Sequence, residues 1–126
     1  MSAEIKMNVL LPDDFPFSVF VAALEGGINY WYRARTYRWQ DAHGNDDLYG
    51  FHAYGTPIEE DNERLIDRET VLCGLAAVCG SDDIKLNGRW RDEIRRAVGS
   101  GDAGLVDSDL ADSIVQTGLF GEIVYG

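Results

Sequence analysis

Two hydrophobic periods open the chain. Apolar residues fall on alternate positions between residues 4 and 11, and this period of two predicts a strand with one apolar face. After Pro16 the apolar residues take the i, i+3, i+4, i+7 spacing of an amphipathic helix, at Phe17, Phe20, Val21 and Leu24. Gly26 and Gly27 predict the end of that helix, where we expect a backbone conformation that other residues avoid.

Aromatic residues then mark a β-hairpin. Residues 28–39 mix aromatic side chains with arginines, as strands often do, although a helix remains possible for their first turn. Residues 48–55 again alternate aromatic side chains with small or polar ones, and the polar residues 40–47 predict the turn between the two strands. Residues 56–66 predict an exposed connection.

Capping residues and apolar spacing predict three further helices. Asp67 caps a helix whose apolar face comprises Val71, Leu72, Leu75, Ala76, Val78 and Cys79. Asn87 caps a helix over residues 88–98 that turns four residues inward, Trp90, Ile94, Ala97 and Val98. Asp107 begins a helix that runs to about Gly118 and buries Leu110, Ala111, Ile114, Val115 and Leu119. Residues 122–125 then predict either an edge strand or a packed tail.

These elements predict one compact α+β domain over residues 1–126, with a small antiparallel sheet of about three strands and three or four helices packed on one face. The longest apolar stretch, residues 17–24, is too short to span a membrane, and no signal-peptide pattern opens the chain. We therefore expect a cytoplasmic protein without membrane contact. Cys73 and Cys79 are expected to be reduced thiols in the core, because their spacing on one helix disfavours a disulfide.

Charge is the most unusual property of the sequence. The 22 Asp and Glu residues outnumber the 11 Lys and Arg residues, which gives a net charge of −11. Residues 41–63 lack Lys and Arg and hold seven acids, Asp41, Asp46, Asp47, Glu59, Glu60, Asp61 and Glu63. Residues 97–126 form a second acidic zone, whereas the arginines of residues 33–38 and 89–96 predict one basic stripe. Direct binding to nucleic acid is not expected of so acidic a chain.

The acidic zone over residues 41–63 has two interpretations. Its carboxylates could imitate the phosphates of a nucleic acid and so occupy a basic groove on a partner protein, with the neighbouring Tyr49 as an aromatic contact. Acidic loops also keep proteins soluble, and acids at helix starts, such as Asp67 and Asp107, are stabilising. The arginines of residues 89–96 are similarly open to two interpretations, a second contact site or a solvated face with internal pairs such as Arg89 with Glu93.

Motifs for catalysis or cofactor binding are missing from the sequence. Neither His43 nor His52 stands in a zinc-binding pattern, and the glycine-rich residues 99–104 lack the lysine of a phosphate-binding loop. We predict no cofactor and no metal site. Asp109 and Asp112 are explained by the helix dipole, with a catalytic carboxylate pair as the alternative.

Four residues define an alternative site in the first quarter of the chain. Glu25, Tyr30, Trp31 and Tyr32 could line a cleft for a small ligand or a substrate, with His52 as a further member. These aromatic side chains could equally belong to the core or contact a partner.

Two segments resemble a known family. They are residues 23–31, ALEGGINYW, and residues 102–126, which end in FGEIVYG. Both resemble small proteins of bacteriophages and prophages to which no activity is assigned, and the resemblance implies a phage setting. In physical terms Phe120 and Tyr125 would pack beside the first segment, while Glu25, Gln116 and Glu122 would face a partner or satisfy buried backbone groups.

The leading hypothesis is a non-enzymatic phage protein that inhibits a host defence system, of the anti-CRISPR or antirestriction type. Its partner would be a host protein or nucleoprotein complex with a basic groove. The alternatives are a small enzyme or ligand-binding protein that uses the aromatic cleft, and a phage assembly adaptor that forms homo-oligomers.

Overall fold

The computed structural model describes residues 11–126, in which the three strands follow one group of helical segments and precede another. Two helical segments come first, α2 (Asp14–Ala22) and the π-helical turn η1 (Ala23–Gly27). Three strands follow, β1 (Tyr32–Arg38), β2 (His52–Pro57) and β3 (Arg64–Asp67). The chain ends with α3 (Arg68–Gly80), α4 (Gly88–Ser100), the 3-10 turn η2 (Ala103–Leu105) and α5 (Ser108–Phe120). The strand predicted over residues 4–11 lies outside the described residues, apart from Leu11, which is in no strand.

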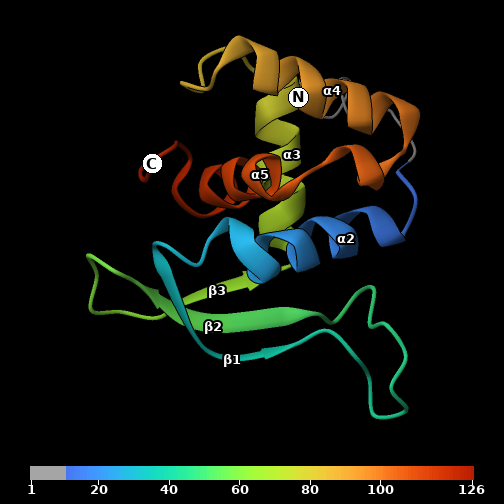
Figure 1. Ribbon diagram of the computed structural model, residues 1–126, viewed down its shortest axis with the longest axis vertical. Helices are drawn as coiled ribbons and strands as arrows, with labels where there is room; N and C mark the ends of the chain where they lie inside the picture. Colours follow the sequence, from blue (N-terminus) through green and yellow to red (C-terminus); the bar gives the residue numbers. More distant parts are fainter. Residues whose placement is uncertain (1–10) are drawn as a thin grey trace.

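The three strands form one antiparallel sheet in the order β1-β2-β3. All the labelled helices lie on one side of this sheet (Figure 1), so the predicted α+β class with helices on one face is confirmed. Strand β1 is an edge strand in which six of the seven residues are exposed, and its pairing with β2 is interrupted by a bulge between Ala34 and Thr36. The predicted hairpin of residues 28–55 is confirmed, although its strands are shifted. The first begins only at Tyr32, and the second runs over His52–Pro57 and not over residues 48–55.

The third strand is not where the sequence indicates it. Residues 64–66 were expected in an exposed connection, and instead they belong to β3, which pairs with β2 from Arg64 opposite Gly55 to Asp67 opposite His52. This strand is four residues long, and within it Ile66 is buried while Leu65 is 40% exposed. So short a segment shows no clear alternation, which explains why the hydrophobic pattern missed it.

Helix α3 rises from the end of β3 and is crossed by α5 (Figure 1). It begins with a capping box, in which the Asp67 carboxylate accepts the Thr70 N–H and the Thr70 hydroxyl accepts the Asp67 N–H. Glycine makes the crossing close: a Cβ atom on Gly74 would overlap the carbonyl oxygen of Ile114, and one on Gly118 would overlap that of Thr70. The two helices therefore meet backbone to backbone.

Gly27 has a packing role and not the conformational role predicted for it. Neither Gly26 nor Gly27 has a positive φ, and the helix continues as a π-helical turn through both. A Cβ atom on Gly27 would overlap the Ser108 carbonyl oxygen at the start of α5, so the glycine lets η1 approach α5.

Two side-chain placements, those of Trp90 and Cys73, differ from the sequence prediction. Trp90 was expected to face inward and is 36% exposed, although Ile94, Ala97 and Val98 on the same helix are buried as predicted. Cys73 was expected in the core and is exposed, while Cys79 is half-buried. Both positions lie at the margin of an apolar face, where spacing alone does not decide which side chains a neighbouring helix covers.

The segment after α5 packs as a tail and forms no strand. Tyr125 stacks on the fully buried Trp31 with ring centroids 5.1 Å apart, and Phe120 lies 5.6 Å from the same ring. This confirms the predicted packing of the tail beside residues 23–31. Over residues 11–126, no helix is long and apolar enough to cross a membrane.

Candidate functional site

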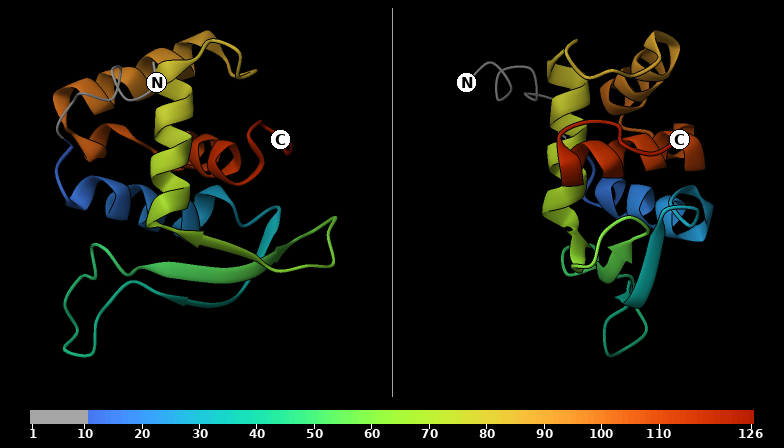
Figure 2. Two further views of the ribbon diagram at one scale, coloured as in Figure 1. Left: turned by 180° about the vertical axis from the view of Figure 1, so that it is seen from behind. Right: turned by 90° about the vertical axis from the view of Figure 1, so that its left-hand side faces the viewer.

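The sheet divides the predicted acidic zone of residues 41–63 into two parts. Residues 39–51 connect β1 to β2 at one end of the sheet, and residues 58–63 connect β2 to β3 at the other. Figure 2 shows the two loops projecting in opposite directions. Asp41, Asp46, Asp47 and Tyr49 lie in the first loop, whereas Glu59, Glu60, Asp61 and Glu63 lie in the second. The acids therefore do not form one continuous surface, because β2 separates them.

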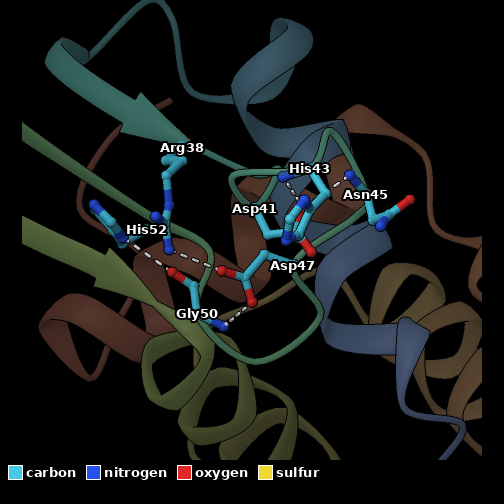
Figure 3. Close-up of polar contacts among 7 residues, drawn as sticks. All are labelled: Arg38, Asp41, His43, Asn45, Asp47, Gly50 and His52. Carbon is cyan, nitrogen blue, oxygen red and sulfur yellow. Dashed lines mark hydrogen bonds and ion pairs between the residues drawn. The ribbon is translucent and has the colours of Figure 1, made fainter.

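Asp41 organises the tip of the first loop, which we call the hairpin loop, residues 39–51. Its carboxylate accepts the backbone N–H groups of His43 and Asn45 at 2.8 and 3.0 Å (Figure 3). The Asp41 N–H in turn donates to the Asn45 carbonyl, and Gly44 completes the turn with a φ of 81°. The tip is thus held by hydrogen bonds within the loop, with His43, Gly44 and Asn45 exposed.

Asp47 fixes the returning half of the hairpin loop. One carboxylate oxygen accepts the Gly50 N–H at 2.9 Å, and the other pairs with the Arg38 guanidinium at 2.8 Å (Figure 3). The Gly50 carbonyl lies 3.0 Å from the Nδ1 atom of His52, which places His52 at the base of the loop and not in a ligand cleft. Both ends of the loop are therefore tied to the sheet.

The start of α2 adds carboxylates beside the hairpin loop. A hydrogen bond to the Asp13 carboxylate raises the pKa of the Tyr49 hydroxyl, and the Arg68 guanidinium lies 5.1 Å from the same Tyr49 ring. This contact brings residues 13 and 14 to the loop, on the same side of the molecule (Figure 1). We use the name "acidic end" for five residues, Asp13, Asp14, Asp41, Asp46 and Asp47. Among the described residues, Asp47 alone of these five forms an ion pair.

The opposite loop is more fully neutralised. Glu60 pairs with Arg64 at 2.8 Å, and Glu63 pairs with Arg35 of β1, which lowers the pKa of the Glu63 carboxyl. Glu59 and Asp61 are exposed. Half of the four acids in this loop are thus engaged by cations, which makes it the weaker candidate for contact with a basic partner.

The predicted basic stripe is also divided. Arg33, Arg35 and Arg38 belong to β1, whereas the arginines of α4 lie on the helix farthest from the sheet (Figure 1). On α4 the predicted pair between Arg89 and Glu93 is confirmed, with a separation of 3.4 Å.

The aromatic cleft predicted from Glu25, Tyr30, Trp31 and Tyr32 is not formed. Trp31 is fully buried, and Tyr32 is 3% exposed. Glu25 and Tyr32 border a small pocket beside Trp39, whereas Tyr30 borders a different cleft, next to α5. The four side chains therefore lie in three separate environments: the core, the pocket beside Trp39 and the cleft next to α5.

A hydrogen-bond network around Asp112 was not predicted from the sequence. Its carboxylate accepts the Tyr30 hydroxyl at 2.7 Å, the Trp31 Nε1–H at 2.8 Å and the Gln116 amide at 2.9 Å. Partial burial, together with this contact to Asp112, raises the pKa of Tyr30 well above its usual value, so the hydroxyl stays a donor. The sequence carried a signal in the i, i+4 spacing of Asp112 and Gln116, which places them on one helix face.

Gln116 joins this network to the tail. Its side-chain oxygen accepts the Val124 and Tyr125 N–H groups at 2.8 Å each, and its amide donates to the Tyr125 carbonyl at 3.1 Å. Of the two roles open for Gln116, the structure shows the satisfaction of backbone groups. The segments of residues 23–31 and 102–126 therefore contact each other directly, through Trp31 and Asp112.

Comparison with known proteins gives no match. None of the protein-family models fits the sequence, and searches of curated proteins and of solved structures also find nothing similar. Function is therefore inferred from the geometry of the molecule.

Proposed function

We propose that this protein acts by binding a basic surface of another protein through its acidic end, as a non-enzymatic inhibitor. The observation that carries the proposal is the tied hairpin loop, which holds Asp46 exposed and contacts the start of α2 through the hydrogen bond between Tyr49 and Asp13. Of the five acids in the acidic end, one is engaged in an ion pair between described residues. Carboxylates fixed in this way need little ordering when they meet cations, so the entropic cost of binding is low.

The net negative charge of the protein favours a partner with a basic surface. A net charge of −11 repels nucleic acids and favours association with positively charged surfaces. A groove that normally holds DNA or RNA has this character, and a protein in it would exclude the nucleic acid. The proposed targets are therefore nucleic-acid-binding complexes of bacterial defence, in keeping with the phage setting that the sequence resemblance implies.

The test uses two matched double variants. Asp14→Asn with Asp46→Asn removes two negative charges from the acidic end, and Glu59→Gln with Asp61→Asn removes the same charge from the opposite loop. Each tagged protein is used to capture partners from a bacterial lysate at low salt. We expect wild type and the opposite-loop variant to retain a nucleic-acid-binding complex, and the acidic-end variant to lose it.

Competition with nucleic acid distinguishes binding in the nucleic-acid groove from general charge attraction. The captured complex should be released by its own DNA or RNA and by salt, because the contact is electrostatic. Equal capture by both double variants, or a complex that the nucleic acid does not displace, would refute the proposal.

A further inference from the structure

A second candidate site lies on the far side of the molecule from the hairpin loop. It is a cleft of about 430 Å³ between the start of α4, one face of α5 and the tail, within the range of about 300–1,000 Å³ that small-molecule sites occupy. Six of its lining residues carry the argument: Tyr30, Lys85, Trp90, Asp109, Asp112 and Tyr125. None of them belongs to the acidic end.

Two carboxylates line one wall of the cleft. Asp109 and Asp112 are three positions apart on α5 and so share a helix face. A carboxylate offers about four acceptor sites, and three donors from Tyr30, Trp31 and Gln116 occupy three of those on Asp112. One site of Asp112 Oδ2 is left for a further donor, and the neighbouring donors fix its position.

The opposite wall carries a cation. Lys85 precedes α4 and borders the same cleft, yet within residues 11–126 no ion pair joins it to a carboxylate. Groups of opposite charge therefore border the cleft without neutralising each other directly. A molecule that bears both charges would satisfy the two walls together.

Aromatic rings supply the remaining contacts. Trp90 is 36% exposed and Tyr30 is 52% exposed, so both side chains are accessible where they border the cleft. An ammonium group near Asp109 and Asp112 would also meet the faces of such rings, which attract cations. The exposure of Trp90, which the sequence did not predict, is explained if a ligand covers it.

We propose that this cleft binds a small zwitterion of the amino-acid type. Its ammonium group would lie against Asp109 and Asp112, and its carboxylate would pair with Lys85. The proposal is independent of the acidic end and of its protein partner.

The test measures binding of the twenty free amino acids to the full chain by calorimetry, at concentrations up to the millimolar range. Each amino acid that binds is compared with its decarboxylated amine and with its deaminated acid. We expect both derivatives to bind at least about tenfold more weakly, because each loses one charged contact. An amine that binds as tightly as its parent amino acid would overturn the zwitterion assignment, as would a failure of all twenty to bind.

Variants locate the site. Asp109→Asn and Lys85→Ala should each weaken binding about tenfold, whereas the exposed Asp92→Asn and Arg33→Ala should leave it unchanged. The Asp14→Asn, Asp46→Asn double variant should also bind normally, so the two proposals fail separately. Unchanged binding in both cleft variants would place the ligand elsewhere and refute the proposal.

Discussion

Single residues in this protein do more than one structural task. Asp112 holds the indole of Trp31, the hydroxyl of Tyr30 and the amide of Gln116, and through Gln116 it fixes the tail. From the sequence, the helix dipole of α5 accounts equally well for Asp109 and Asp112, since both lie near the start of the helix. In the structure, Asp112 also accepts a hydrogen bond from the buried indole N–H of Trp31. Contacts between residues more than eighty positions apart in the sequence are not visible in a local pattern.

Asp112→Ala is therefore expected to destabilise the fold. The buried Trp31 Nε1–H would lose its acceptor, which costs about 1–3 kcal/mol, and the Tyr30 contact would be lost in addition. The measurement is the free energy of unfolding in urea. Asp109→Ala is the matched control on the same helix face, and its exposed side chain predicts a change of about 0.5 kcal/mol or less. Equal losses for the two variants would contradict this account of Asp112.

At the scale of elements, the crossing of α3 and α5 depends on two glycines. Gly74 faces the Ile114 carbonyl and Gly118 faces the Thr70 carbonyl, so each helix supplies a small residue where the other approaches. The caps and the hydrophobic spacing predict both helices, but the local pattern gives neither glycine a packing role. A glycine inside a helix becomes informative only when its neighbour in space is known.

Gly118→Ala is expected to push the two helices apart. The added methyl group has no free space beside the Thr70 backbone, and overpacking of this kind costs about 1–3 kcal/mol. Gly99→Ala is the control, because it lies in α4 with open space around it and should stabilise the helix by about 0.5–1 kcal/mol. If the helices are as close as described, the free energy of unfolding in urea decreases for Gly118→Ala and increases for Gly99→Ala. An increase for Gly118→Ala would show that the helices are not so close.

The elements also show where sequence reasoning succeeded. The hairpin, the caps Asp67, Asn87 and Asp107 and the buried faces of α4 and α5 followed from turn chemistry and spacing, which are local properties. Strand β3 could not be predicted from local properties, since its position is decided by pairing with β2. The sequence shows which loop residues are acidic, but their division between the two ends of the sheet follows from topology.

At the scale of the molecule, burial decreases with distance from the middle of the helical layer. Helix α5 buries seven of its thirteen residues, whereas α4 buries three of thirteen and lies farthest from the sheet (Figure 1). Its main contacts are with α3 and η2. The molecule is thus expected to open first at α4.

Hydrogen exchange measures this directly. Amide groups of α4 should exchange at least about tenfold faster than those of α3 and α5, because a local opening of α4 exposes few apolar side chains. Saturation of the cleft with a zwitterion that binds should slow the α4 exchange, since the start of α4 forms one of its walls. Exchange of α4 at the same rate as α5 would mean that the helices unfold only together.

The exposed edge of the sheet has a further consequence. Within residues 11–126 no strand pairs with the outer edge of β1, and a second copy of the same strand could pair there. Arg33, Arg35 and Arg38 lie along it, and Glu63 and Asp47 pair with the last two. An antiparallel copy that sets Arg33 opposite Arg38 would bring guanidinium groups together. The few cations of an acidic chain thereby disfavour edge-to-edge pairing of two copies of the sheet.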